Sequence, residues 1–212
     1  ERGRLFMKNY TGYALLAVGA LFGFSVATGA SADVNKLTES CVGCHGKGGS
    51  STEAAIPNIG GYSAEYMTGA LKLYKSKERP CPEVKIPAGA KKGSKSDMCQ
   101  AVKDLSDADI KQIAESFAEQ KFVRTPQKFD PVLAKKGKGL HDKLCEKCHS
   151  EGGSVASDDS GILAGQKMAY LDEQIKFFTE GKRPMAKKMK PKLEELDKAG
   201  IEAVIHYYGS FK

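Results

Sequence analysis

The sequence predicts an all-α protein made of two tandem domains with the same design. The first observation is an internal repeat, in which an offset of 104 residues (145 − 41) superimposes identical residues of the two halves without a gap. The second is that apolar residues recur with helical spacing in several segments, whereas no segment has the alternation of a β-strand. The matched pairs are Cys41 and Cys145, Cys44 and Cys148, His45 and His149, Gly61 and Gly165, Tyr66 and Tyr170, Arg79 and Arg183, and Pro80 and Pro184.

Both halves contain the motif Cys-x-x-Cys-His, at residues 41–45 and 145–149. This order is the attachment signature of c-type haem, because each thiol can add to a vinyl group and the histidine can ligate the iron. A single copy could belong to a zinc or thioredoxin-like site, but two copies in a repeat favour haem. The sequence therefore predicts two cytochrome c-like domains, each wrapped around one covalently attached haem c. The attachment residues are Cys41, Cys44, Cys145 and Cys148, and the proximal iron ligands are His45 and His149.

Residues 1–32 are expected to be a secretory signal peptide with an N-terminal extension. An apolar run at residues 13–26 is followed by Ala30-Ser31-Ala32, a typical cleavage site. The alternative is an uncleaved anchor, although the run is shorter than the ~20 residues of a membrane span. We expect the mature chain to begin at Asp33 and to be periplasmic, since haem attachment and disulfides belong to oxidising compartments.

The first domain is predicted over residues 33–121. A short helix from Asp33 is expected to lead into the first motif, and the glycine-rich stretch 46–49 should turn the chain. Residues 64–75 predict a helix whose one side carries Tyr66, Ala70, Leu73 and Tyr74. Ser106 and Asp109 predict a capped start for the last helix. The buried stripe of that helix should be Ile110, Ile113, Ala114 and Phe117.

An insertion distinguishes the first domain from the second. Beyond Pro80 the offset falls to 91 (189 − 98), so the first half has thirteen extra residues (104 − 91), which Cys81 and Cys99 flank. A disulfide between these cysteines would close a loop of about twenty residues and contribute on the order of 3 kcal/mol. A free thiol pair for metal or redox chemistry is the alternative.

The second domain is predicted over residues 132–212, after a linker at 122–131 that contains Pro126 and Pro131. Its first helix should span about 132–146. The side of that helix facing the core should carry Leu133, Gly137, Leu140, Leu144 and Cys148. Later helices are expected at 170–179 and 199–208.

The second axial ligand decides what a haem can do, because a closed iron transfers electrons and an open iron binds small molecules. His141 and His206 are the histidines outside the motifs, and both fall in the second half. The repeat superimposes Met98 on Met189 at the offset of 91. A thioether is a soft ligand that raises the reduction potential. We therefore predict Met98 and Met189 as the distal ligands.

Other candidates for the distal position are weaker. Met185, four residues before the predicted ligand, is the alternative for the second iron. Met67 and Met168 fall in predicted helices, where methionine usually fills the core. His206 is expected on a helix face or in the core, and His141 at the surface or in packing.

The composition argues against a disordered chain and against nucleic-acid binding. The 212 residues are 41% apolar, which does not suggest disorder, and the formal charge of +7 becomes +5 (7 − 2) without residues 1–32. No block of charge is typical of nucleic-acid binding. The lysines at 135, 136 and 138 and at 187, 188, 190 and 192 are either solvated faces or docking surfaces for acidic partners.

Several segments resemble the two-haem cytochrome subunit of flavocytochrome c sulfide dehydrogenase. They are GLHDKLCEKCHSEGG, ILAGQ, RPMAKKMKPKLEEL and the linker EQKFVRTPQKFD. The similarity extends over residues 33–212, but the insertion between Cys81 and Cys99 departs from the family pattern. The resemblance implies the same covalent haem attachment and the same histidine and methionine ligands.

The resemblance also implies a partner. A flavoprotein subunit with FAD would oxidise sulfide, and this chain would pass the electrons through its haems to a soluble cytochrome or similar acceptor. The chain would be a non-catalytic subunit without catalytic residues, and it contains no Rossmann glycine fingerprint for FAD. Two alternatives are a free-standing periplasmic two-haem carrier and a peroxidase-type haem enzyme with an open iron.

Overall fold

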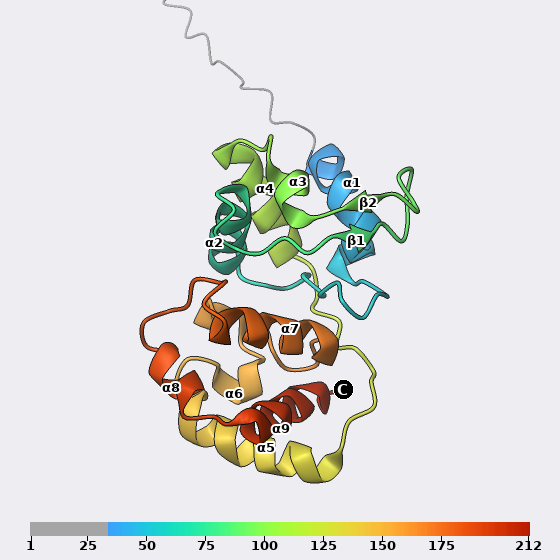
Figure 1. Ribbon diagram of the computed structural model, residues 1–212. Helices are drawn as coiled ribbons and strands as arrows, with labels where there is room; N and C mark the ends of the chain where they lie inside the picture. Colours follow the sequence, from blue (N-terminus) through green and yellow to red (C-terminus); the bar gives the residue numbers. More distant parts are fainter. Residues whose placement is uncertain (1–33) are drawn as a thin grey trace, which may run out of the picture. The chain divides into compact units, whose positions relative to one another are not determined.

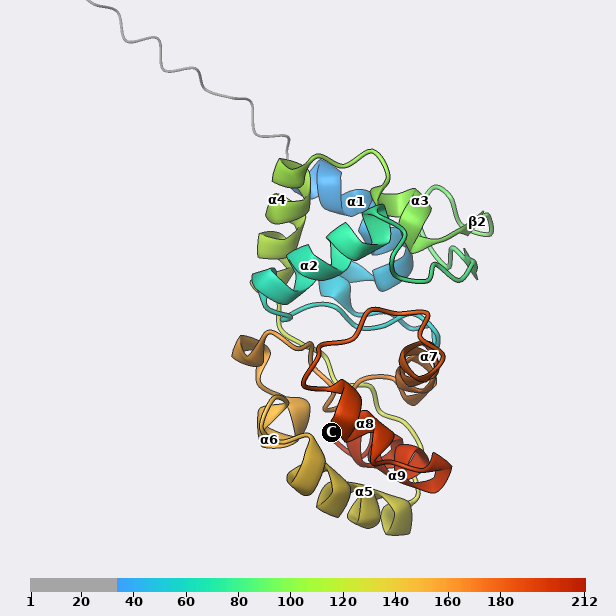
Figure 2. The same cartoon turned by 60° about the vertical axis from the view of Figure 1, so that its left-hand side comes forward.

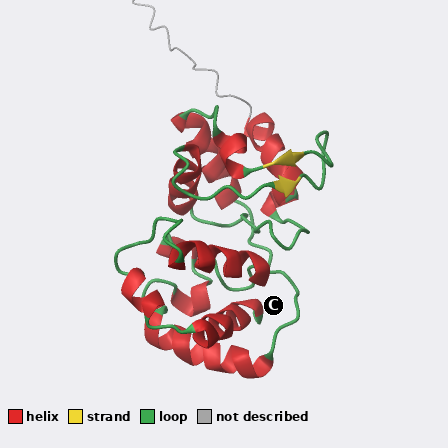
Figure 3. Ribbon diagram, in the orientation of Figure 1, coloured by secondary structure: helices red, strands yellow, loops and turns green. Residues whose placement is uncertain are grey.

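A computed structural model of the chain describes residues 34–212, whose regular secondary structure consists of helices and one short hairpin, joined by loops (Figures 1 and 3). The predicted signal peptide and the start of the mature chain lie outside these residues. Among the residues that the structure describes, no helix is long and apolar enough to cross a membrane. The described residues belong to one contact unit, and the two halves of the repeat form two tandem domains within it.

The first domain contains four α-helices, a 3-10 turn and two strands among its described residues. They are α1 (Val34–His45), η1 (Lys47–Gly49), α2 (Ala64–Lys75), β1 (Val84–Lys85), β2 (Lys95–Ser96), α3 (Met98–Val102) and α4 (Asp107–Ala118). Helix α4 begins as predicted, because the Ser106 side chain accepts from the Asp109 backbone and the Asp109 side chain accepts from the Ser106 backbone. Its predicted stripe is confirmed, since Ile110, Ile113, Ala114 and Phe117 are all buried.

The buried face of α2 is wider than predicted. The bounds of the helix match the expected range, and its fully buried residues are Met67 and Leu71. Tyr66 and Tyr74, on the predicted side, are half-buried, pack against the same core and also contact arginines. The Arg79 guanidinium lies 4.5 Å from the centre of the Tyr74 ring. The tyrosines of this helix therefore contribute both to the core and to polar contacts with the arginines.

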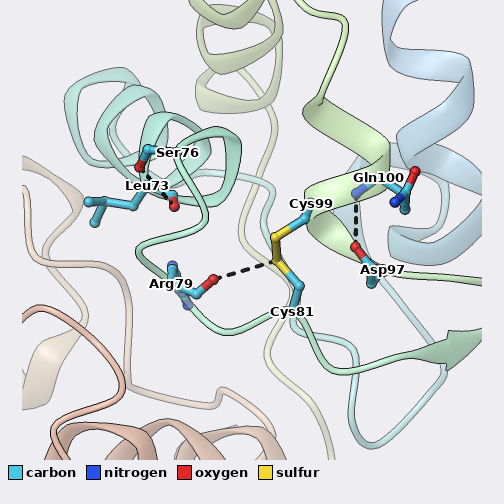
Figure 4. The surroundings of a disulfide bond; sticks show 7 residues. All are labelled: Leu73, Ser76, Arg79, Cys81, Asp97, Cys99 and Gln100. Carbon is cyan, nitrogen blue, oxygen red and sulfur yellow. Dashed lines mark hydrogen bonds between the residues drawn. A yellow bond between two sulfur atoms is a disulfide. The ribbon is translucent and has the colours of Figure 1, made fainter.

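The insertion forms a hairpin that the sequence analysis did not predict. Strands β1 and β2 pair antiparallel, with Val84 opposite Ser96 and Lys85 opposite Lys95. These strands are only two residues long, which is too short for alternation to be visible in the sequence. A disulfide joins Cys81 to Cys99 just after the start of α3, and Figure 4 shows it beside Arg79 and Asp97.

The regular secondary structure of the second domain is entirely helical among its described residues. Its elements are α5 (Pro131–Leu144), α6 (Ser150–Gly153), η2 (Ala156–Asp158), α7 (Met168–Thr179), α8 (Lys190–Glu194) and α9 (Lys198–Gly209). Helices α5 and α9 lie side by side in both views (Figures 1 and 2). Helix α5 starts at Pro131, one residue earlier than expected, because proline suits the first helical position. The Asp130 side chain caps it by accepting from Val132 and Leu133.

The end and the buried face of α5 also differ from the prediction. The helix stops at Leu144 rather than at residue 146, because both Cys145 and Glu146 donate their backbone N–H to the His141 carbonyl. Its buried residues are Ala134, Gly137, His141 and Leu144. Gly137 and Leu144 are buried as predicted, whereas Leu133 and Leu140 are half-buried and Cys148 is exposed. Ala134 and His141 are the buried residues that the prediction missed.

The repeat is visible in the backbone hydrogen bonds. The Gly61 N–H donates to the Phe117 carbonyl at 2.8 Å, and the Gly165 N–H donates to the Tyr208 carbonyl at 2.8 Å. Both glycines have positive φ, at 76° and 75°, which favours glycine over other residues. The two glycines are related by the offset of 104, and their two acceptors by the offset of 91. The same hydrogen bond therefore joins the middle of each domain to its last helix.

The close approach of α5 to α9 depends on Gly137. A Cβ at this position would collide with the backbone of Ala203 and with Tyr207, whereas a Cβ at Gly139 in the same helix meets nothing. We expect Gly137→Ala to lower the free energy of unfolding by about 1 to 3 kcal/mol through overpacking. Gly139→Ala, the matched control, should raise it by up to about 1 kcal/mol because alanine is the better helix former. Urea denaturation of the holoprotein measures both; equal effects would contradict the packing.

Candidate haem-binding sites

The first motif occupies the last turns of α1, and His45 is the final residue of this helix. The His45 ring is buried, and its Nδ1 lies 3.0 Å from the Pro57 carbonyl oxygen. A carbonyl can only accept, so Nδ1 carries the proton and Nε2 has a free lone pair for a metal. Burial lowers the pKa of His45, while the hydrogen bond to Pro57 raises it and the charge of Lys167 lowers it. The neutral ring suits an iron ligand.

The second motif lies in the turn after α5. Cys145 caps the end of the helix, and the N–H groups of Cys148 and His149 both donate to the Cys145 carbonyl. Burial, followed by the charge of His141, lowers the pKa of His149 to about 4. The second ring is therefore also neutral. Its Nδ1 is buried without a hydrogen-bond partner among the described residues, unlike Nδ1 of His45.

The four motif thiols are unbridged in the structure. Burial raises the pKa of Cys41, Cys44 and Cys145 above the ordinary thiol value. They are thus neutral thiols, the form that adds across a vinyl group with its proton. Cys81 and Cys99, in contrast, are already joined and are not available for attachment.

A buried hydrogen-bond network supports the second motif. His141 is 0% exposed, its Nδ1 lies 3.0 Å from the Tyr208 hydroxyl, and its Nε2 lies 2.6 Å from Glu146 Oε2. Glu146, inside the motif, also accepts from the N–H groups of Glu151 and Gly152. The sequence analysis expected His141 either at the surface or in packing, and the structure places it in the core. Its role is to hold the attachment turn.

Two arginines at matched positions of the repeat make crossed contacts between the domains. Arg79 Nη2 donates to the Tyr170 hydroxyl at 2.8 Å, and Arg183 Nη2 donates to the Tyr66 hydroxyl at 3.4 Å. Both guanidiniums also donate to Gln174 Oε1, at 2.9 and 2.8 Å. The sequence repeat detected these arginines and tyrosines but gave no sign that they meet.

These arginines fit a haem. In each of them Nε is buried and has no hydrogen-bond partner among the described residues. A buried guanidinium with an unused donor fits an anion, and haem carries two propionate carboxylates. Arg79 and Arg183 would therefore hold propionates, while the motif thiols and histidines would hold the porphyrin and iron. When bound, the haem supplies one-electron redox chemistry.

The predicted methionines have different surroundings. Met98 is the first residue of α3, next to the disulfide, and packs partly buried against the core of the first domain. Met185 and Met189 are both half-buried, and Met189 directly precedes α8. Met67 is buried in the first core and Met168 packs against the second, in agreement with the prediction that they fill space. Met98 and Met189 stay the predicted distal ligands.

A buried polar network joins the two domains, and the sequence analysis missed it. The Asn58 N–H donates to Gln166 Oε1 at 3.0 Å, and Gln166 Nε2 donates to the Asn58 carbonyl at 2.8 Å and to the Tyr62 hydroxyl at 2.7 Å. Asn58 Nδ2 donates to the Val123 carbonyl in the linker. One sequence signal could have revealed this network. Gln166 is a polar residue that follows the apolar residues of ILAGQ, and the repeat superimposes it on Tyr62.

The comparisons with known proteins show two cytochrome c domains in the chain. Residues 31–115 match the family model of cytochrome c, and residues 132–207 match that of subunit III of cbb3-type cytochrome c oxidase. The chain is 34% identical over 154 residues to cytochrome c4 of Stutzerimonas stutzeri, covering 68% of this chain and 69% of the relative. The chain belongs to the cytochrome c4 family of two-haem cytochromes c.

Other relatives support the same fold. The crystal structure of reduced recombinant cytochrome c4 from Pseudomonas stutzeri superimposes with a TM-score of 0.68 at 27% identity, covering 84% of this chain and 97% of that chain. The thiosulfate dehydrogenase electron acceptor of Thiomonas intermedia is 26% identical over 181 residues, covering 80% of this chain and 76% of the relative. As a cytochrome c4-like protein, the chain carries two covalently attached haems c and transfers electrons.

The distal ligand of the second haem can be tested with two neighbouring methionines. Met189→Ala is expected to remove the second haem's share of the weak far-red absorption band of methionine-ligated ferric haem, because the thioether is lost. Met185→Ala, four residues away and equally half-buried, is the matched control and should retain the full band. The opposite pattern in the absorption spectra would assign the ligand to Met185.

Proposed function

We propose that this chain is a free-standing periplasmic carrier that moves electrons between separate redox enzymes. The observation that supports it most is the match to cytochrome c4, whose crystal structure covers 84% of this chain. The same comparisons support the carrier, an alternative in the sequence analysis, better than the subunit of a sulfide-oxidising flavoprotein. The resemblance to that subunit holds at the level of a two-haem cytochrome c.

The predicted axial ligands support electron transfer rather than catalysis at the iron. Irons closed by His45 and Met98, and by His149 and Met189, leave no open position for a substrate. A peroxidase-type activity would require one open iron. Because Arg79 and Arg183 share Gln174, the propionates that they would hold lie toward a common region between the domains. This arrangement favours electron transfer from one haem to the other inside the chain.

A sulfur-oxidising enzyme is the donor that we favour. The relative from Thiomonas intermedia is named as the electron acceptor of thiosulfate dehydrogenase, and it matches 80% of this chain. Sulfide oxidation, with FAD in a partner subunit, is the more specific donor that the sequence resemblance implied. Both donors release electrons that a carrier must accept one at a time.

The charge distribution favours an acidic partner at the second domain. Residues 122–212 contain 17 Lys and Arg and 13 Asp and Glu, a net charge of +4 (17 − 13). Residues 33–121 contain 13 and 12, a net charge of +1 (13 − 12). Lys187 and Lys188, which are exposed and close to Met189, are part of this excess. Complementary charge accelerates encounter more than it strengthens binding.

Purification from native periplasm tests the proposal. The cytochrome is expected to elute from size exclusion at its monomer mass without a yellow flavoprotein, and to be reduced when thiosulfate and the periplasmic extract are added together. Stable co-elution with an FAD-containing protein that reduces the haems with sulfide would contradict the free-standing carrier and favour the subunit. Turnover of hydrogen peroxide by the purified cytochrome would favour the haem enzyme.

A further inference from the structure

Lys167 is a second-domain residue whose side chain ends in the first domain. It directly precedes α7 and is only 3% exposed. Its Nζ donates to three backbone carbonyls, those of Ser51 at 2.7 Å, Glu53 at 2.6 Å and Ile56 at 2.8 Å. A lysine ammonium has three donors, so every donor is used. The three carbonyls therefore form a specific binding site for a positively charged group.

The segment that Lys167 holds carries the partner of the first iron ligand. Pro57 follows Ile56 in the chain, and its carbonyl oxygen lies 3.0 Å from His45 Nδ1. The residue on the other side, Asn58, is held by Gln166 through both its N–H and its carbonyl. Two consecutive residues of the second domain thus fix the chain on both sides of the carbonyl that orients His45.

The ammonium group also acts on His45 by its charge. Its Nζ lies 2.8 Å from the carbonyl oxygen of Ile56, the residue directly before Pro57, whose own carbonyl oxygen lies 3.0 Å from His45 Nδ1. Burial lowers the pKa of Lys167 itself to about 8, so the amine is protonated at neutral pH, and the three carbonyls stabilise that form. A positive charge this close to the first haem site disfavours ferric relative to ferrous iron, because ferric iron carries one more positive charge.

Among the described residues, the second haem site has no equivalent of this contact. The repeat superimposes Lys167 on Ser63, whose hydroxyl accepts from the Tyr66 N–H as the cap of α2. It superimposes Pro57 on Gly161, and His149 Nδ1 has no partner among the described residues. The connection runs in one direction, from the second domain to the ligand of the first.

We propose that Lys167 is a positioning residue that the second domain supplies to the first, where it fixes the segment that orients His45 and selectively raises the reduction potential of the haem bound there. The role concerns the protein's own two haems, so it does not depend on which enzymes act as donor and acceptor. Docking of the two domains and the potential of the first haem are then linked through one side chain.

The test is a potentiometric titration of the holoprotein in which both haems are followed by absorption. The variants are Lys167→Met and Lys198→Met, the second being a matched control that removes an exposed lysine from the start of α9. The step that belongs to the second haem is identified by its displacement in Met189→Ala or, if that spectrum is unchanged, in Met185→Ala. Lys167→Gln provides a second neutral variant whose amide can still donate to the carbonyls.

For Lys167→Met and Lys167→Gln, the ratio of reduced to oxidised first haem at a fixed ambient potential is expected to fall about tenfold, or about 59 mV for a one-electron couple. The second haem and the Lys198→Met variant should change little. An unchanged first haem, or equal shifts of both haems, would overturn the proposal even if the variants lose stability. If Lys167→Met does not fold, the Lys167→Gln titration decides.

Discussion

The structure depends on the hydrogen bonds by which each domain completes the other. Gln166 satisfies both backbone groups of Asn58, and Lys167 satisfies three carbonyls of the preceding segment. An unpaired buried polar group costs about 1 to 3 kcal/mol, so while the domains are docked these contacts from the second domain stabilise the conformation of the segment before Asn58. The orientation of His45 through Pro57 follows from this constraint.

Local features of the structure could be predicted, and contacts between the domains could not. The capping residues Ser106 and Asp109 and the haem motifs act over a few positions, so a single sequence reveals them. The buried faces of α2 and α5 were predicted only in part, because Tyr66 both packs against the core and contacts Arg183, and the polar His141 occupies the core. Residues paired about a hundred positions apart leave no periodic signal. The β1–β2 hairpin was missed for a different reason, its length.

The two haem sites share a plan but differ in how the protein supports them. The first relies on the Pro57 carbonyl of its own domain, on Lys167 from the other domain, and on a disulfide next to Met98. The second relies on the buried network of His141 and Glu146 within its own attachment turn. Such differences separate the potentials of chemically identical haems. A carrier with two unequal haems has a preferred direction of internal electron transfer.

The central claim is that both irons are closed by protein ligands and therefore only transfer electrons. Carbon monoxide tests it most directly, because it binds ferrous haem where a ligand position is open. When the fully reduced holoprotein is exposed to carbon monoxide, we expect its Soret absorption band to stay unchanged. A shift of this band, in part or in full, would show an open iron and contradict the assignment of the chain as an electron carrier.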